Sequence, residues 1–221
     1  MRLANRQHVA ALRLPGTVWI GSAPTEPLRR LTTGIQCLDS VLDGGLPRGG
    51  LCEIVGAPSS GCTSLACALL AATTRRGEVT AVIDLPNALH PATLWAAGTD
   101  LDRVLWVRPP SLQVSLKCAE MILAAGGFGL VVLDLGVPTV HHLPLHVWPR
   151  LVLVAKQAGT ALAVLARQRV AGSFATMSVI LTLQRARWSP RLFEGVMIQA
   201  VLGRNRIGMP GRKARMVMGN G

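Results

Sequence analysis

The segment GAPSSGCTS has the residue types and the spacing of a loop that binds phosphate. Gly56 and Gly61 stand five residues apart, and Thr63 and Ser64 follow directly. In such a loop the glycines let backbone N–H groups converge on phosphate oxygens, a hydroxyl holds Mg²⁺, and a lysine neutralises the phosphates. Cys62 occupies the lysine's position. A thiol carries no positive charge, so we expect weak anion binding through the backbone and no efficient hydrolysis. A glycine-rich turn that needs no ligand is the alternative.

An acidic residue that could serve this loop ends a later apolar run, FGLVVLDLG. Asp134 is the only acid in that run, and its place at the end of an apolar strand is where a carboxylate that organises Mg²⁺ belongs. The alternative is an aspartate that caps the next turn. Cys62 and Cys67 have no matching histidines or cysteines at zinc spacing, so we expect no metal site.

The elements that must position these residues alternate between strands and helices. Short apolar runs predict buried strands at LCEIVG, EVTAVIDL, RVLWVRP, FGLVVLDLG and TALAVLARQ. Helical patterns lie at TSLACALLAATT, HPATLWAAG, SLQVSLKCAEMILAAGG, with Ser111 as its cap, and HVWPRLVLVAKQAG, helical after Pro149. This alternation predicts an α/β fold with a mainly parallel central sheet flanked by helices. Three strand-like runs after residue 175 have no helix between them, which predicts antiparallel strands at one edge.

The composition is that of a folded domain. The chain has 221 residues, half of them hydrophobic, and five cysteines that lie mostly in apolar runs. This favours one domain with a substantial core and with free thiols in a reducing compartment. No uninterrupted apolar run reaches the length of a membrane span, so we expect a cytoplasmic protein with no membrane partner.

Positive charge is concentrated in the last third of the chain. Twelve of the 23 basic residues lie from Arg150 onward. Of the 11 acidic residues in the chain, only Glu194 lies in this segment. A basic segment of this kind predicts an anionic partner, either DNA or an acidic protein. The candidate contacts are Arg204, Arg206, Arg212, Lys213 and Arg215. The alternative is that scattered arginines keep an apolar domain soluble and protect an edge strand from aggregation.

Three stretches together resemble the core of RecA-type recombinases. They are TTGIQCLDSVLDGGLPRGGLCEIVGAPSSGCTSLACALL, VIDLPNALHP and GLVVLDL. The resemblance covers roughly residues 31–210 and is densest over 31–135. It implies a RecA-like domain over residues 31–221, with a degenerate phosphate loop and basic C-terminal strands, preceded by an N-terminal arm over residues 1–30. It also implies DNA and self-association as candidate partners.

Two departures from the RecA pattern fall on catalytic positions. Pro86 stands where RecA carries the glutamate that activates the attacking water, and Cys62 replaces the lysine. We therefore expect no catalytic residues, no ATPase activity and no required cofactor, with weak ATP and Mg²⁺ binding left open. Gln168 falls where RecA has a glutamine that senses the γ-phosphate. Arg204 and Arg206 resemble two RecA lysines that reach the neighbouring protomer's nucleotide.

Among RecA relatives, the short chain, the degraded loop, the shortened DNA loops and the phrase LDRVLWVRP resemble the ImuA-type proteins. The resemblance implies an accessory role in damage-induced translesion synthesis at the nucleoid. Its implied partners are an ImuB-type polymerase-like protein, an error-prone DNA polymerase, RecA and single-stranded DNA. One alternative is a DNA-dependent ATPase or recombinase in which Lys117, Arg75 or Arg76 replaces the missing lysine. Another is a regulator of RecA filaments.

Overall fold

The computed structural model describes residues 29–136, 146–189 and 193–219. Nearly all of the expected N-terminal arm, and most of the segment after Asp134, lie outside these ranges. The described strands are β1 Arg30–Leu31, β2 Leu46–Pro47, β3 Leu51–Gly56, β4 Val79–Asp84, β5 Val104–Val107, β6 Phe128–Asp134, β7 Ala161–Ala166, β8 Met177–Trp188, β9 Phe193–Asn205 and β10 Lys213–Met218. The α-helices are α2 Gln36–Val41, α3 Cys62–Arg75, α4 Pro91–Ala96, α5 Leu112–Ala125 and α6 Val147–Ala158, with 3₁₀ turns η1 at Leu101–Arg103 and η2 at Gly172–Phe174.

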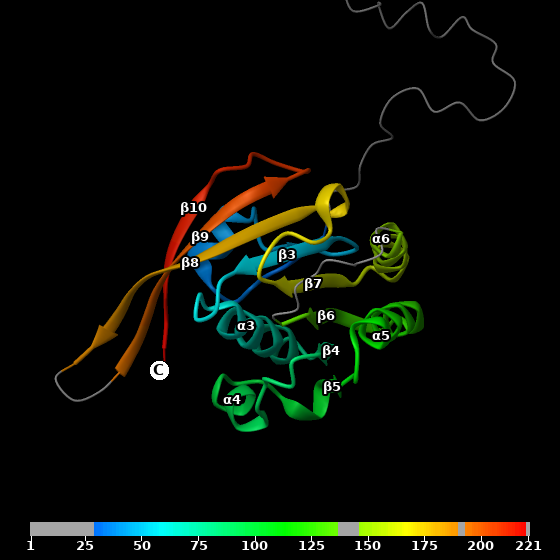
Figure 1. Cartoon of the computed structure of the whole chain (residues 1–221), viewed down its shortest axis with the longest axis horizontal. Coiled ribbons are helices and arrows are strands. Elements are labelled where there is room, and N and C mark those ends of the chain that lie inside the picture. The colour runs from blue at the N-terminus through cyan, green and yellow to red at the C-terminus, as the bar shows by residue number, and fades with distance from the viewer. Residues whose placement is uncertain (1–28, 137–145, 190–192, 220–221) are drawn as a thin grey trace, which may run out of the picture.

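An eight-stranded sheet in the order β10-β9-β8-β3-β7-β6-β4-β5 forms the centre of the molecule (Figure 1). The six strands from β8 to β5 are parallel, and β9 and β10 add to β8 as antiparallel strands. This confirms the predicted α/β fold. The antiparallel edge begins one strand later than the run of helix-free segments suggested, because β8 pairs in parallel with β3.

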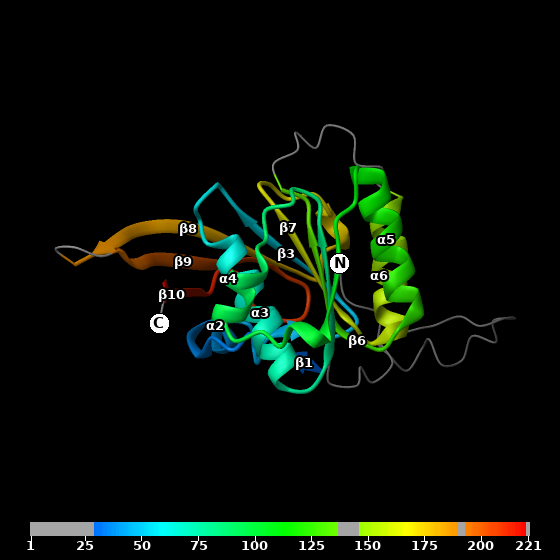
Figure 2. The same cartoon turned by 90° about the horizontal axis from the view of Figure 1, so that it is seen from below.

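Helices cover the two faces of the sheet unequally. In Figure 2, α5 and α6 lie on one side of the sheet, and α2, α3 and α4 lie on the other. The α3 side is the larger apolar core, with Leu65 and Leu69 of α3 packed among residues from β3 to β10. The α5–α6 side is a smaller core around Leu116 and Trp148. Its sheet residues come from strands β3, β4, β6 and β7, so these two helices leave the same face of β8, β9 and β10 uncovered.

The helix ends follow local chemistry. The Ser111 hydroxyl accepts a hydrogen bond from the Val114 N–H at 3.4 Å, which confirms the predicted cap of α5. Helix α6 begins at Val147 rather than after Pro149. Proline is tolerated there because N–H groups in the first turn have no partner within the helix. None of the helices in the described ranges is long and apolar enough to cross a membrane.

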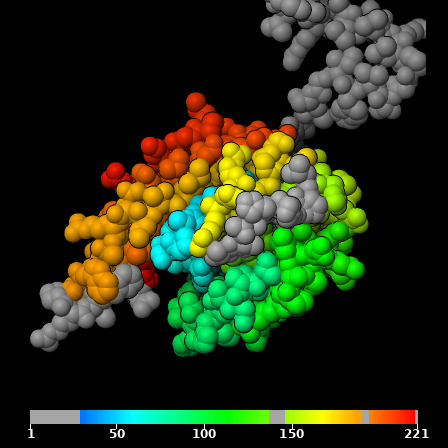
Figure 3. All heavy atoms as spheres, in the orientation of Figure 1, coloured from blue at the N-terminus to red at the C-terminus, as the bar shows by residue number. Residues whose placement is uncertain are grey.

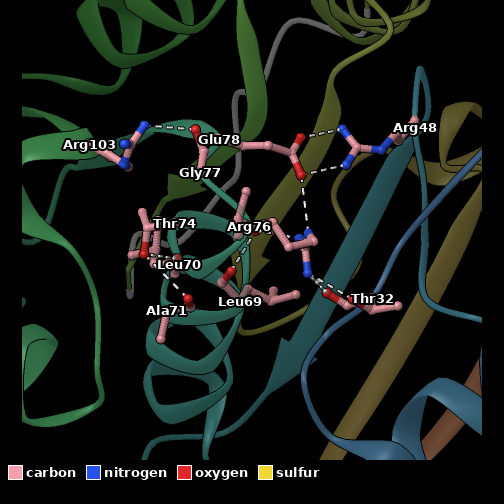
Figure 4. A network of polar contacts seen from close by, with 11 residues as sticks. Thr32, Arg48, Leu69, Leu70, Ala71, Thr74, Arg76, Gly77, Glu78 and Arg103 are labelled. Carbon is pink, nitrogen blue, oxygen red and sulfur yellow. Dashed lines mark hydrogen bonds and ion pairs between the residues drawn. The ribbon is translucent and has the colours of Figure 1, made fainter.

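A cluster of ion pairs ties the edge opposite the phosphate loop together (Figure 4). Arg48 binds Glu78 through two contacts of 2.7 and 2.8 Å, and the Arg76 Nε donates to the same carboxylate at 3.1 Å. Arg76 also donates to the Thr32 hydroxyl at 2.7 Å. These hydrogen bonds, first of all those from Arg48, lower the pKa of Glu78. These contacts hold the segment around Thr32, which precedes α2, against the C-terminal end of α3.

Candidate functional site

The segment GAPSSGCTS forms a loop between the carboxyl end of β3 and the first turn of α3, as the sequence predicted. Gly61 is the residue before the helix and has a left-handed backbone, with φ of 91°. A Cβ at Gly61 would collide with the Ile198 side chain of β9, and one at Gly56 would collide with the Ser60 hydroxyl. Both glycines are therefore required by backbone conformation or by close packing. Figure 3 shows the loop, in cyan, at the surface beside the orange β8.

The Cys62 side chain turns back onto the loop that precedes it. Its Sγ lies 3.3 Å from the Ser60 Oγ, and a Cβ at Gly56 would lie 2.9 Å from the same sulfur. Burial raises the pKa of the Cys62 thiol more than the Ser60 hydrogen bond lowers it, and the charge of Asp134 adds a smaller increase. The thiol is therefore neutral at pH 7. It adds no positive charge to the end of the loop.

Asp134 ends β6 and faces Asp84, which ends the neighbouring strand β4 in the same register. The Asp134 Oδ1 accepts a hydrogen bond from the Gly136 N–H at 2.8 Å, so this side chain does cap the next turn. Burial raises the pKa of Asp134 to about 6, and the charge of Asp84 adds to the increase. At pH 7 a carboxyl group with this pKa is still mostly ionised, so Asp134 keeps the charge that a Mg²⁺ ligand needs.

Pro86 lies beside Asp134 at the mouth of the same site. Asp84 stabilises the turn that contains Pro86. The Asp84 carboxylate accepts hydrogen bonds from the N–H groups of Ala88 at 3.0 Å and Leu89 at 3.2 Å. A Cβ on Gly136 would lie 2.8 Å from the Pro86 Cβ. The proline ring thus stands next to the segment that follows β6, in the position the sequence assigned to a catalytic glutamate. It has no group that could accept a proton.

These residues share one open pocket of about 980 Å³. Its lining includes Gly56, Gly61, Cys62, Thr63, Ser64, Pro86 and Asp134, together with residues of α4 and of the β7 end. The structure therefore brings the predicted loop residues together with the predicted acid. The backbone and hydroxyl groups suit a phosphate, whereas Cys62 and Pro86 supply neither the charge nor the base that phosphoryl transfer needs.

Arg75 and Arg167 are the basic residues on this pocket within the described ranges. Arg167 follows Ala166, which pairs with Val55, so Arg167 comes level with Gly56 at the start of the loop. Sequence reasoning missed Arg167 and singled out Gln168, which falls where RecA has a glutamine that senses the γ-phosphate; the pocket lining includes Arg167 and not Gln168. The register of two adjacent parallel strands decides this, and a single sequence does not show that register.

The other two proposed replacements for the lysine lie elsewhere. Arg76 is held by Glu78 and Thr32 at the far end of α3. Lys117 is on α5, which packs on the opposite face of the sheet from α3. Neither residue lines the pocket.

Buried Glu53 fixes the connection that carries Arg167. Its carboxylate accepts hydrogen bonds from the Val170 and Ala171 N–H groups, each at 2.6 Å, and Arg169 lies 3.6 Å away. Glu53 is fully buried in β3. Strand β3, which leads into the phosphate loop, thus also positions the segment after β7.

The five basic candidates of the last third separate into three environments. Arg204 and Arg206 both donate to the Ser173 carbonyl, at 3.3 and 3.4 Å. Arg212 is paired with Asp43 and donates to the Ser40 carbonyl, which ties the start of β10 to the α2 region. Lys213 and Arg215 are exposed on β10.

Known proteins show similarity to this chain in both sequence and fold. A family model described as the RecA N-terminal domain matches residues 16–143. Protein RecA of Synechocystis sp. is 35% identical over 115 residues, which is 52% of this chain and 32% of that protein. Protein RecA of Clavibacter michiganensis subsp. michiganensis is 38% identical over 116 residues, again 52% of this chain and 32% of that protein. The chain thus spans about a third of the length of the curated relatives it matches.

A solved structure agrees with this relationship at the level of the fold. The crystal structure of the RadB recombinase superposes with a TM-score of 0.67 at 23% identity, and the match covers 84% of this chain and 94% of that one. The matched family model, the strand order and the loop between β3 and α3 all lead to one assignment. This chain belongs to the RecA family.

Proposed function

We propose that this protein is a RecA-like accessory factor that does not hydrolyse ATP and that supports damage-induced translesion DNA synthesis. It does so by binding an ImuB-type polymerase-like protein that works with an error-prone DNA polymerase, and DNA is its second ligand. The observation that carries the proposal is the shared pocket of Cys62, Pro86 and Asp134. Two of these three positions, Cys62 and Pro86, lack the chemistry that turnover requires.

The fold supports a binding role independently of that pocket. The core of the sheet is well packed, with Val131 and Val164 fully buried, which suits a scaffold that binds partners. Each missing group supplies charge or positioning in the transition state, and such losses cost orders of magnitude in rate. The assignment to translesion synthesis is supported by the sequence resemblance to the ImuA-type group.

The test has two parts. Purified protein is incubated with Mg-ATP and single-stranded DNA, and phosphate release is compared with a buffer blank. We expect no turnover above the blank, and DNA-stimulated hydrolysis would overturn the non-hydrolysing part of the proposal. Binding to a purified ImuB-type protein is then measured by calorimetry, with a RecA protein as the comparison partner. Preference for RecA over the ImuB-type protein would favour a regulator of RecA filaments instead.

A second function is favoured by the position of Arg167. Its guanidinium makes no hydrogen bond or ion pair with any residue of the described ranges, and it borders the loop near Gly56. An arginine there could neutralise a bound phosphate in place of the lysine, in a DNA-dependent ATPase or in a protein that binds nucleotide without turnover. Titration of a fluorescent ATP analogue distinguishes these roles. Binding that Arg167→Gln abolishes and Arg75→Gln leaves unchanged would support a nucleotide site that uses Arg167.

A further inference from the structure

The pocket continues past the phosphate loop as a groove along α3. We define the α3–α4 groove as the part of the pocket lined by Gly34, Ser64, Ala68, Arg75, Ala92 and Ala96. Helix α3 forms its floor, α4 forms one wall, and the segment before α2 forms the other. Figures 1 and 2 place α4 beside α3 on the same face of the sheet. Neither the phosphate loop nor Asp134 occupies this part of the pocket.

Small residues keep the α3–α4 groove open. Ala92 and Ala96 are four positions apart, so they lie on one face of α4, and both are exposed. Gly34 crosses α3 so closely that a Cβ at this position would lie 2.9 Å from the Ala72 Cβ. Its φ of 81° also disfavours a side chain. The backbone of a bound chain can therefore come close to the floor of the groove.

Each end of the groove carries positive charge. At the loop end, the first turn of α3 offers backbone N–H groups and the positive end of the helix dipole, and Arg167 lies beside it. At the far end, the Arg75 guanidinium reaches from one wall to the other. Its Nη1 donates to the Ala97 carbonyl at 3.5 Å, and a Cβ at Gly34 would lie 3.7 Å from its Nη2. Asp134, at the loop end, is the only acid on the pocket within the described ranges.

The distance between these two ends sets the length of a ligand that contacts both. Ala72, which Gly34 crosses, and Arg75 lie eight and eleven residues after Ser64 on α3. At about 1.5 Å per residue, the two ends are roughly 12–17 Å apart. An extended peptide spans this distance in about four or five residues.

The geometry points to an extended acidic peptide, a segment of a protein partner, as the ligand of the α3–α4 groove. Its two acidic side chains stand about five positions apart. One accepts hydrogen bonds from the α3 N–H groups and Arg167, the other accepts from Arg75, and small residues fill the space between. Within the described ranges, the lining of the pocket has no aromatic side chain on which a nucleobase would stack. The groove therefore suits a peptide better than a base.

This inference rests on the proposed role as a binding protein, and direct titration tests it separately from ATP turnover and from binding of the ImuB-type protein. The probe is the rhodamine-labelled peptide Glu-Ala-Gly-Ala-Gly-Glu with an amidated C-terminus, and its anisotropy is followed as protein is added. The matched control peptide, Gln-Ala-Gly-Ala-Gly-Gln, has the same length and no charged side chain. We expect saturable binding of the acidic peptide and binding of the control that is weaker by about tenfold or more.

Variants at both ends and in the middle of the groove locate the peptide. Arg75→Gln and Arg167→Gln should each weaken binding roughly five- to tenfold, because each removes one charged hydrogen-bond donor. Ala96→Leu fills the groove and should weaken binding by about tenfold or more. Lys117→Gln and Ala124→Leu make the same kinds of change on α5, which packs on the opposite face of the sheet. They should leave the affinity within about twofold of the original protein.

The responses of Arg75 and Ala96 separate a peptide from a ligand held at the loop alone. If only Arg167→Gln weakens binding, the site takes a phosphate or a nucleotide, and the proposal is wrong. Equal affinity for the two peptides, or no saturation at about 1 mM protein, would also overturn it. ATP hydrolysis by a protein that still binds the peptide would contradict the proposed function and not this inference. Circular dichroism melts check folding, and Arg75→Gln should barely change Tm, since Arg75 makes one long hydrogen bond within the described ranges.

Discussion

Asp84 and Asp134 stand opposite each other at the carboxyl ends of adjacent parallel strands, and they have separate tasks. Asp84 is fully buried and caps the turn that presents Pro86. Asp134 caps its own turn through Gly136 and faces the pocket. Two carboxylates this close raise the free energy of the doubly ionised state, which is one cause of the raised pKa of Asp134. The carboxyl ends of β4 and β6 are thus held together by hydrogen bonds to the backbone.

Replacing Asp134 with asparagine should stabilise the protein at neutral pH. The folded-state pKa of about 6 lies above the usual range of an aspartate, so the favourable contribution of the protonated acid is complete below the unfolded-state pKa and is lost as pH rises through 6. Asparagine can still accept the Gly136 hydrogen bond. We expect Asp134→Asn to raise the free energy of unfolding by roughly 1–3 kcal/mol at pH 7.5 and by almost nothing at pH 4. Urea denaturation at both pH values measures this, and a pH-independent difference would contradict it.

Gly61→Ala should be strongly destabilising because it adds two costs. Alanine is strained at φ of 91°, and its Cβ would collide with the Ile198 Cδ1. We expect a loss of about 2–4 kcal/mol. Gly77→Ala is the matched control, since Gly77 also has a positive φ but open space around its Cα, and it should cost about 1 kcal/mol. Ile198→Val removes the colliding methyl group and should recover part of the loss in a double-mutant cycle. Equal costs at the two glycines would show that the collision does not occur.

Glu78→Gln should weaken the fold at neutral pH and not at acidic pH. Arg48 and Arg76 lower the pKa of Glu78, so its contribution is present above the unfolded-state pKa and is lost as pH falls through the folded-state pKa. We expect a cost of about 1 kcal/mol at pH 7 that shrinks below pH 4. Chemical denaturation in low salt gives the comparison. Asp102→Asn serves as the control, since within the described ranges Asp102 forms hydrogen bonds through its backbone N–H and not through its carboxylate.

Cys62→Lys alone should not produce ATP hydrolysis, because Pro86 still supplies no base. The loop would gain a charge where the neutral thiol now lies, so binding of an ATP analogue should tighten while turnover stays at the level of the blank. Cys62→Lys/Pro86→Glu restores both missing groups and is the informative partner variant. Phosphate release from the single variant would show that the proline is not the limiting defect.

Several features were predictable from local patterns. The glycine spacing, the apolar run before it and the Ala/Leu-rich helix after it predicted the loop between β3 and α3, and Ser111 predicted the start of α5. These patterns are local because turn chemistry and hydrogen-bonded caps involve residues a few positions apart. The start of α6 was predicted three residues late, at Arg150 instead of Val147, because proline in a first turn breaks no hydrogen bond.

The features that local patterns missed depend on how strands pair. Arg167 borders the pocket because β7 lies beside β3, and Arg185 joins Lys213 on one face because β8, β9 and β10 are in a particular register. In the sequence, the alternation of Arg185 and Arg187 along one strand was the available signal that both side chains lie on the same face of β8. No local pattern in the sequence predicted that Arg204 and Arg206 bind the Ser173 carbonyl or that Arg212 pairs with Asp43.

The sequence by itself determined the α/β order of elements and the glycine frame of the loop between β3 and α3, and its resemblance to RecA predicted that Cys62 and Pro86 stand where that family has a lysine and a glutamate. These follow from residue identity and local backbone preference. Only the tertiary structure decided that Cys62, Pro86 and Asp134 share a pocket, that Asp134 has a raised pKa, and which arginines remain open to solvent. Burial, strand register and charge proximity arise between residues that are distant along the chain, and only the folded sheet sets them.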